Sequence, residues 1–113
     1  MGVRVIAITS SHYTCEKSRH SSEKHLADVS NLAIDSLVEK GDATLVLENT
    51  SFKVGPSSTL AAVFIINIIM VQTIENLMKQ GVEVPVFVSN NISGGEAHNH
   101  DHLAKYKARL KHL

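Results

Sequence analysis

The chain has 113 residues, which is enough for one domain at most, and 43% of them are hydrophobic, which suits a globular core. Eleven cations balance eleven anions, so the zero net charge gives no reason to expect nucleic acid or an anionic membrane as a partner. Cys15 is the only cysteine, which excludes a disulfide framework within the chain and predicts a reducing, cytoplasmic location.

The first predicted element is a strand over Val3–Thr9. VRVIAIT is a continuous, β-branched run of the kind found in parallel strands that are buried on both faces. A polar loop over Thr9–Ser22 follows, at the end of a strand where open α/β sheets bind ligands. The loop contains Ser10, Ser11 and His20, so it is either an exposed hydroxyl-rich connection or one wall of a binding site.

The next segment, Ser22–Lys40, allows two interpretations. Its apolar residues recur at the spacing of one amphipathic helix, at Leu26, Val29, Ala33 and Leu37. The stretch ADVSNLAID fits equally well as the end of a short helix followed by a strand over Leu32–Asp35. Periodicity alone does not decide between them.

A turn at Gly41 and Asp42 leads into a predicted short strand over Ala43–Leu47, and Glu48–Lys53 is predicted as a loop. The longest helix is then predicted between Gly55 and Gly81. Hydroxyl residues precede it and a lysine and a glycine end it, as helix starts and stops require.

The centre of this helix, Leu60–Val71, is apolar except for Asn67. The run is shorter than the roughly 20 residues that a membrane span needs, and polar residues flank it, so a buried core helix is the preferred interpretation. Beyond the helix, Val82–Val88 is predicted as an edge strand or an extended segment, because Pro85 lacks the donor of a central ladder. Ser89–Gly95 is predicted as a loop.

A terminal helix is predicted within His98–Leu113. Its apolar stripe consists of Leu103, Tyr106, Leu110 and Leu113.

The start of the long helix is one candidate for chemistry. Free amides and the positive end of the helix dipole form an anion site, to which Ser57, Ser58 and Thr59 add hydroxyl groups. Ordinary capping explains the same residues, and from the local sequence it is the simpler explanation.

The histidines and loop carboxylates are the other candidates. His98–His102 holds alternate histidines, which are either a solvated helix start or part of a metal site, although no further ligand is suitably spaced. His20, His98, Glu48 and Glu96 are candidate groups for general acid–base chemistry. Dinucleotide, P-loop, nucleophile-elbow and zincin motifs are missing from the sequence, and no cofactor or metal is predicted.

The order of these motifs resembles the second half of the SIS, or sugar isomerase, domain. The resemblance rests on VRVIAITS, SRHSS, ADVSNLAID, a GDA turn, and the stretch from KVGPSSTLAAVF to SNNISGGEAHN. It is similar in particular to bacterial phosphosugar isomerase-like proteins related to phosphoheptose isomerase, and it covers the chain from about Gly2 to the C-terminus.

The resemblance implies an α/β fold, in which a three-layer α/β/α sandwich surrounds a parallel, flavodoxin-like sheet. It favours the split interpretation of Ser22–Asp35. It also implies a sugar-phosphate site bordered by hydroxyl residues and a histidine, namely Ser10, Ser11, His20, Ser57, Ser58 and Thr59, with Glu96 and His98 as further candidates. The family's reaction is aldose–ketose interconversion, which needs a base and an acid but no metal.

The family also has a hydroxyl-rich phosphate loop and earlier elements that this sequence does not contain. The chain is therefore expected to be the C-terminal portion of a single SIS domain over residues 1–113. Expected partners are a phosphorylated sugar and either further copies of the chain or a missing N-terminal half. The alternatives to an incomplete isomerase are a non-catalytic phosphosugar sensor and an inactive truncated product.

Overall fold

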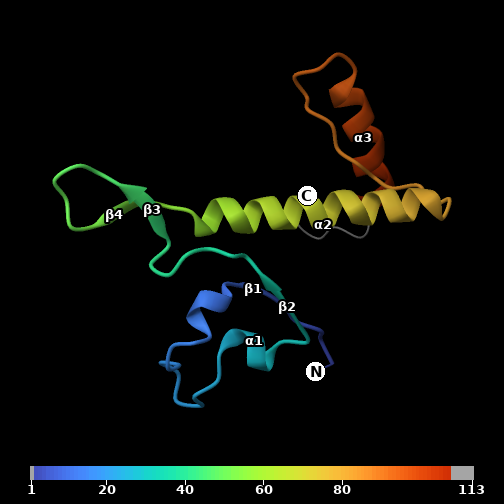
Figure 1. The fold of residues 1–113 in the computed structure, drawn as a ribbon. Helices are drawn as coiled ribbons and strands as arrows, with labels where there is room; N and C mark the ends of the chain where they lie inside the picture. Colours follow the sequence, from blue (N-terminus) through green and yellow to red (C-terminus); the bar gives the residue numbers. More distant parts are fainter. Residues whose placement is uncertain (1, 108–113) are drawn as a thin grey trace. The chain divides into compact units, whose positions relative to one another are not determined.

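The computed structural model describes residues 2–107, which form two compact units that divide between Val71 and Gln72 (Figure 1). The first unit contains strands β1 to β4, a short 3₁₀ helix, helix α1 and most of helix α2, and the second contains helix α3. The chain combines helices with small parallel and antiparallel sheets, so it is α/β in the general sense that the sequence predicts.

Two parallel strands form the first sheet. β1 (Ile6–Thr9) pairs with β2 (Leu32–Asp35), in a register that sets Ile6 opposite Leu32 and Thr9 opposite Asp35. Helix α1 (Leu26–Val29) precedes β2, so the split interpretation of this segment is confirmed and the single amphipathic helix is wrong. The reason is tertiary: hydrogen bonding to a strand distant in sequence outweighs the local periodicity.

Strand β1 is shorter and more exposed than the sequence predicts. It begins at Ile6 instead of Val3, and the Ile6 side chain remains 58% exposed although Ala7 is buried. A parallel strand is buried on both faces only where helices cover both faces of its sheet. The described part of the chain does not provide that cover, so the prediction of a strand buried on both faces is wrong here.

A β-hairpin follows. β3 (Ala43–Val46) confirms the predicted strand, and it pairs antiparallel with β4 (Lys53–Pro56), where a loop and a turn are predicted from the sequence. Gly55 and Pro56 weaken the strand signal of β4, because glycine and proline are both poor strand formers. Pro56 ends the strand opposite Ala43, where its missing N–H group interrupts no further ladder.

Helix α2 (Ser58–Lys79) confirms the predicted long helix and its end. Gly81 has a φ of +74°, and the amides of Gly81 and Val82 donate to the carbonyls of Met78 and Leu77 in a Schellman arrangement. The prediction of a buried helix is wrong, because none of its 22 residues is buried. By length and composition alone α2 could also cross a membrane.

The second unit contains the end of α2, the segment after it and helix α3 (Gly95–Tyr106). No strand forms over residues 82–88, so only the extended-segment alternative remains. In place of a ladder, Asn99 of α3 accepts from the Val88 amide at 3.0 Å and donates to the Val88 carbonyl at 2.8 Å. The terminal helix is confirmed as far as Tyr106, and the predicted stripe positions Leu110 and Leu113 lie outside the described residues.

Candidate functional site

A cleft of about 420 Å³ lies in the first unit, at the carboxyl end of β1. Three segments form it: the end of β1 with the loop after it, the connection from β2 to β3, and the first turn of α2. The lining residues are Ile8, Thr9, Ser10, Tyr13, Ser36, Val38, Asp42, Ser58, Thr59 and Ala62. Its position matches the sheet edge where α/β proteins bind ligands.

Ser10 fixes the loop after β1. Its side chain is only 5% exposed, and its hydroxyl donates to the Val38 carbonyl while accepting from the His12 amide at 3.3 Å. The first of these hydrogen bonds joins the β1 loop to the connection after β2, and the second lies within the β1 loop itself. Ser10 is therefore first a structural residue of the cleft wall.

Asp35 holds the same two loops together from the end of β2. Its carboxylate accepts from the Ser11 amide at 3.1 Å and from the Leu37 amide at 2.9 Å. Hydrogen bonds from Ser11 and then from the Leu37 amide hold the pKa of Asp35 below its ordinary value. Tyr13 adds a further link, because its hydroxyl accepts from the Gly41 amide at 2.9 Å.

The first turn of α2 is capped by Asp42. The Asp42 carboxylate accepts from the Ser57 amide at 2.9 Å, the Ser58 amide at 2.6 Å and the Ser58 hydroxyl at 2.8 Å. The Ser57 hydroxyl donates instead to the Asp42 carbonyl at 2.9 Å. A carboxylate of the protein itself thus occupies the candidate anion site at the start of α2.

Acid is expected to weaken this cap. Hydrogen bonds to the carboxylate, led by the one from the Ser58 side chain, hold the pKa of Asp42 below the ordinary value of about 3.9. A lowered folded-state pKa stabilises the fold above the unfolded value, and that stability is lost as the pH falls through the folded value. Circular dichroism at 222 nm should therefore show helicity falling more steeply below about pH 4 in the wild type than in Asp42→Asn.

The asparagine side chain of that variant keeps an oxygen that can accept from the Ser57 and Ser58 amides, so the comparison isolates the charge. Identical acid profiles for the two proteins would show that the carboxylate charge does not stabilise α2.

The structure gathers some of the predicted site residues in the first unit and separates others. Ser10, Ser58 and Thr59 line the cleft, and Ser57 lies directly behind Ser58 at the Asp42 cap. Ser11 stands beside the cleft, because it is not among the lining residues and its amide is bound by Asp35.

Neither His20 nor Glu48 lines the cleft. The Nδ1 atom of His20 lies 2.7 Å from the Ser22 hydroxyl and accepts from the Ser22 amide at 3.2 Å, so the ring is engaged within its own exposed loop. Glu48 is exposed in the turn between β3 and β4.

Glu96 and His98 belong to the second unit. Glu96 is exposed in the first turn of α3, and the Nε2 atom of His98 lies 2.8 Å from the Val86 carbonyl. The ring of His98 also meets that of His102 edge-on, with their centroids 4.5 Å apart. Within residues 2–107 no group of three or more His, Cys, Asp or Glu side chains is arranged to hold a metal ion.

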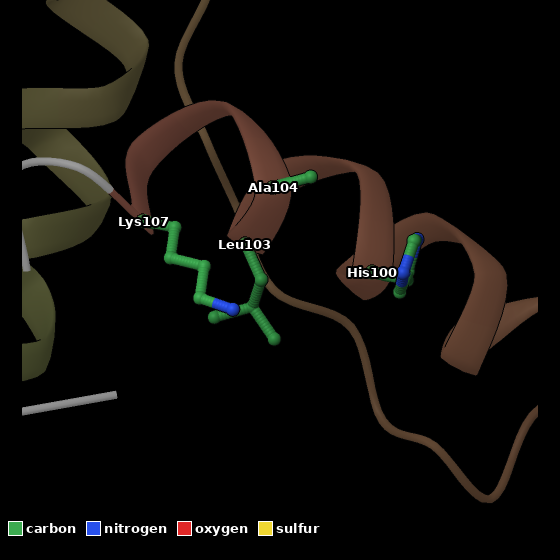
Figure 2. A pocket seen from close by; sticks show the side chains of 4 residues that line it. All are labelled: His100, Leu103, Ala104 and Lys107. Atoms are coloured by element: carbon green, nitrogen blue, oxygen red, sulfur yellow. The ribbon is translucent and has the colours of Figure 1, made fainter.

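Helix α3 also borders a hollow of about 360 Å³. Figure 2 shows the side chains that line it, which are His100, Leu103, Ala104 and Lys107. Its lining is mostly aliphatic, so it lacks the convergent polar groups of the cleft in the first unit.

Sequence reasoning missed seven of the ten lining residues, among them Tyr13, Ser36, Val38 and Asp42. The Gly41-Asp42 turn is visible in the sequence, but its role as a cap depends on folding that brings Asp42 to Ser57, 15 residues further on. A pattern search within one helix therefore has no signal for it. Asp42 has a φ of +67°, a left-handed conformation that aspartate tolerates better than most residues.

Curated relatives align with almost the whole chain. A UPF0309 protein from Caldanaerobacter subterraneus is 41% identical over 115 residues, which cover 99% of this chain and 47% of the relative. UPF0309 proteins from Shouchella clausii and Listeria monocytogenes are 41% and 37% identical, and the matches cover 46% and 44% of those relatives. No protein-family model matches the chain. The chain spans about half the length of the curated relatives it matches.

Proposed function

We propose that this chain is the C-terminal part of a phosphosugar-binding SIS domain, a partial three-layer α/β/α sandwich. The observation that carries the proposal is the cleft at the end of β1, because it brings together hydroxyl residues from segments far apart in the sequence: Ser10, Ser36, Ser58 and Thr59. Its volume of about 420 Å³ falls in the ordinary range of small-molecule sites.

The hydroxyl groups of the sugar are the part of the ligand that this cleft suits. Thr59, Ser36 and Asp42 offer donors and acceptors of the kind that recognise a polyol. The phosphate belongs elsewhere, because the Asp42 carboxylate already occupies the α2 amides and would repel a second anion. We therefore assign the phosphate to the part of the domain that this chain does not span.

Binding without chemistry is the favoured activity of this chain by itself. Neither His20 nor Glu48 lines the cleft, so the first unit supplies no histidine or glutamate there for proton transfer. Isomerisation needs both a base and an acid, and the other two candidates, Glu96 and His98, belong to the second unit. The proposal includes no cofactor, no metal and no nucleic-acid partner.

The cytoplasm is the proposed location. Cys15 is a free, exposed thiol, which a reducing compartment preserves.

Calorimetric titration with a panel of aldose and ketose phosphates tests the proposal. We expect saturable binding of at least one sugar phosphate and no conversion between aldose and ketose. The matching unphosphorylated sugar should bind about equally well, because the phosphate is assigned outside this chain, and inorganic phosphate should bind more weakly than either. If the purified chain converted an aldose phosphate into the ketose phosphate, it would be an enzyme, and the proposal of binding without chemistry would be wrong. Equal, non-saturating heats for all ligands would refute phosphosugar binding by this chain.

A further inference from the structure

The apolar surface of α2 is exposed along its length. Leu60, Phe64 and Val71 follow one line of the helix and are 74%, 66% and 66% exposed. Ile66, Ile68 and Ile69 lie on its other sides and are also exposed, so the helix is apolar all round. A helix of that kind belongs inside a core. We call the surface formed by Leu60, Phe64 and Val71 the α2 face.

The first unit, as far as the structure describes it, provides no cover for the α2 face. Its buried hydrophobic residues are Ala7 and Val38, neither of them on α2. Strand β1 has an exposed side as well, at Ile6. A folded domain of this size normally buries more than half of the surface that its unfolded chain exposes, so the layers that complete this core come from elsewhere.

We propose that the α2 face binds the polypeptide that corresponds to the part of the relatives this chain does not span. The relatives carry the same segment within a chain about twice as long. The remainder of such a chain, slightly more than half of each relative, is therefore large enough to add a further layer over α2. A distinct complementary polypeptide fits this observation better than a second copy.

The polar residues of α2 favour a protein partner over a membrane, although the helix is long enough to span one. The apolar run Leu60–Val71 rises only about 18 Å, whereas a bilayer core is about 30 Å thick. Directly after it, the side-chain amide of Gln72 donates to the Glu75 carboxylate at 2.9 Å and to the Asn76 side-chain oxygen at 3.2 Å. Exposed polar residues of this kind form the solvent-accessible rim of protein interfaces.

Tryptophan fluorescence gives a direct test, because the chain contains no tryptophan. The 113-residue chain is co-expressed with the remaining part of the Caldanaerobacter relative, made as a separate polypeptide. Phe64→Trp reports on the α2 face, and Phe52→Trp is the matched control, since Phe52 is similarly exposed, at 62%, in the β3–β4 turn. We expect a one-to-one complex in which Trp emission at position 64 moves to shorter wavelength and emission at position 52 does not.

A second pair of variants measures the contact itself. Phe64→Lys is expected to reduce the yield of the complex about 30-fold or more, as for a residue central to an interface, whereas Asn76→Lys on the same helix should leave it unchanged. The proposal is overturned if the chain purifies without its co-expressed partner, if it forms homo-oligomers that leave the partner unbound, or if it partitions into phosphatidylcholine vesicles. No sugar phosphate is used, so the outcome is independent of the proposed ligand.

Discussion

Replacing Gly95 with alanine is expected to disrupt the start of α3. Gly95 is buried, and a Cβ atom added there would lie 2.1 Å from the Ser89 carbonyl oxygen and 3.3 Å from the Cα atom of Asn90. Those are backbone atoms, so relief requires the whole 89–94 turn to move away. Forcing extra volume into such a contact costs about 1–3 kcal/mol or more. Hydrogen exchange of the 86–99 segment should rise accordingly.

The neighbouring glycine provides the control, because it separates a clash from backbone strain. Gly94 has a φ of +79° and open space around its Cα atom, so Gly94→Ala carries only the cost of a left-handed residue, about 1–2 kcal/mol. Gly95→Ala should therefore raise exchange at Val88, which Asn99 holds from α3, more than Gly94→Ala does. The reverse order would mean that the close approach to Ser89 is not what fixes this turn.

The sequence predicts the helices and strands of this chain better than it predicts how they pair and what covers them. α2 and its stop at Gly81 follow from local chemistry, since caps and apolar runs act within a few residues. β2 required a partner to be recognised, because Leu32–Asp35 becomes a strand by pairing with β1. β4 was missed for the related reason that Gly55 and Pro56 indicate a turn until Ala43 is placed opposite them.

The predicted burial of the two most apolar segments is wrong. An apolar run predicts that a segment needs cover, and it says nothing about whether the same chain supplies that cover. Val3–Thr9 and Leu60–Val71 were both expected to be buried, and both remain largely exposed. Relatives about twice as long explain how a sequence patterned for a full core can leave that core open in this chain.

The sequence predicts some of the residues that line the cleft, but it does not predict what each side chain does there. Ser10, Ser58 and Thr59 do meet in one cleft, as parallel-strand topology and the resemblance imply. Their hydroxyls differ in what they do, because Ser10 and Ser58 are bonded to the protein itself, to Val38 and Asp42. No spacing rule distinguishes a hydroxyl that holds a loop from one that is available to a ligand.

That distinction can be measured by comparing Ser10 with Thr59. Ser10→Ala leaves the Val38 carbonyl without its buried donor, and an unsatisfied buried group of this kind costs about 1–3 kcal/mol. We expect urea unfolding to shift to lower denaturant and hydrogen exchange to rise over residues 36–42, with weaker sugar-phosphate binding as a consequence. Ser21→Ala, in the exposed loop after β1, should change stability by less than about 0.5 kcal/mol.

Thr59→Val should affect ligand binding at the same cleft and leave the stability of the fold unchanged. Valine has nearly the shape of threonine, and the Thr59 side chain is exposed in the first turn of α2, so the fold should keep its stability. If the Thr59 hydroxyl binds the sugar, titration should show affinity falling roughly tenfold, the size of one lost hydrogen bond. Only Ser10→Ala is expected to lower the stability of the fold. If Thr59→Val lowers it by a similar amount, the Thr59 side chain supports the cleft wall and is not available to a ligand.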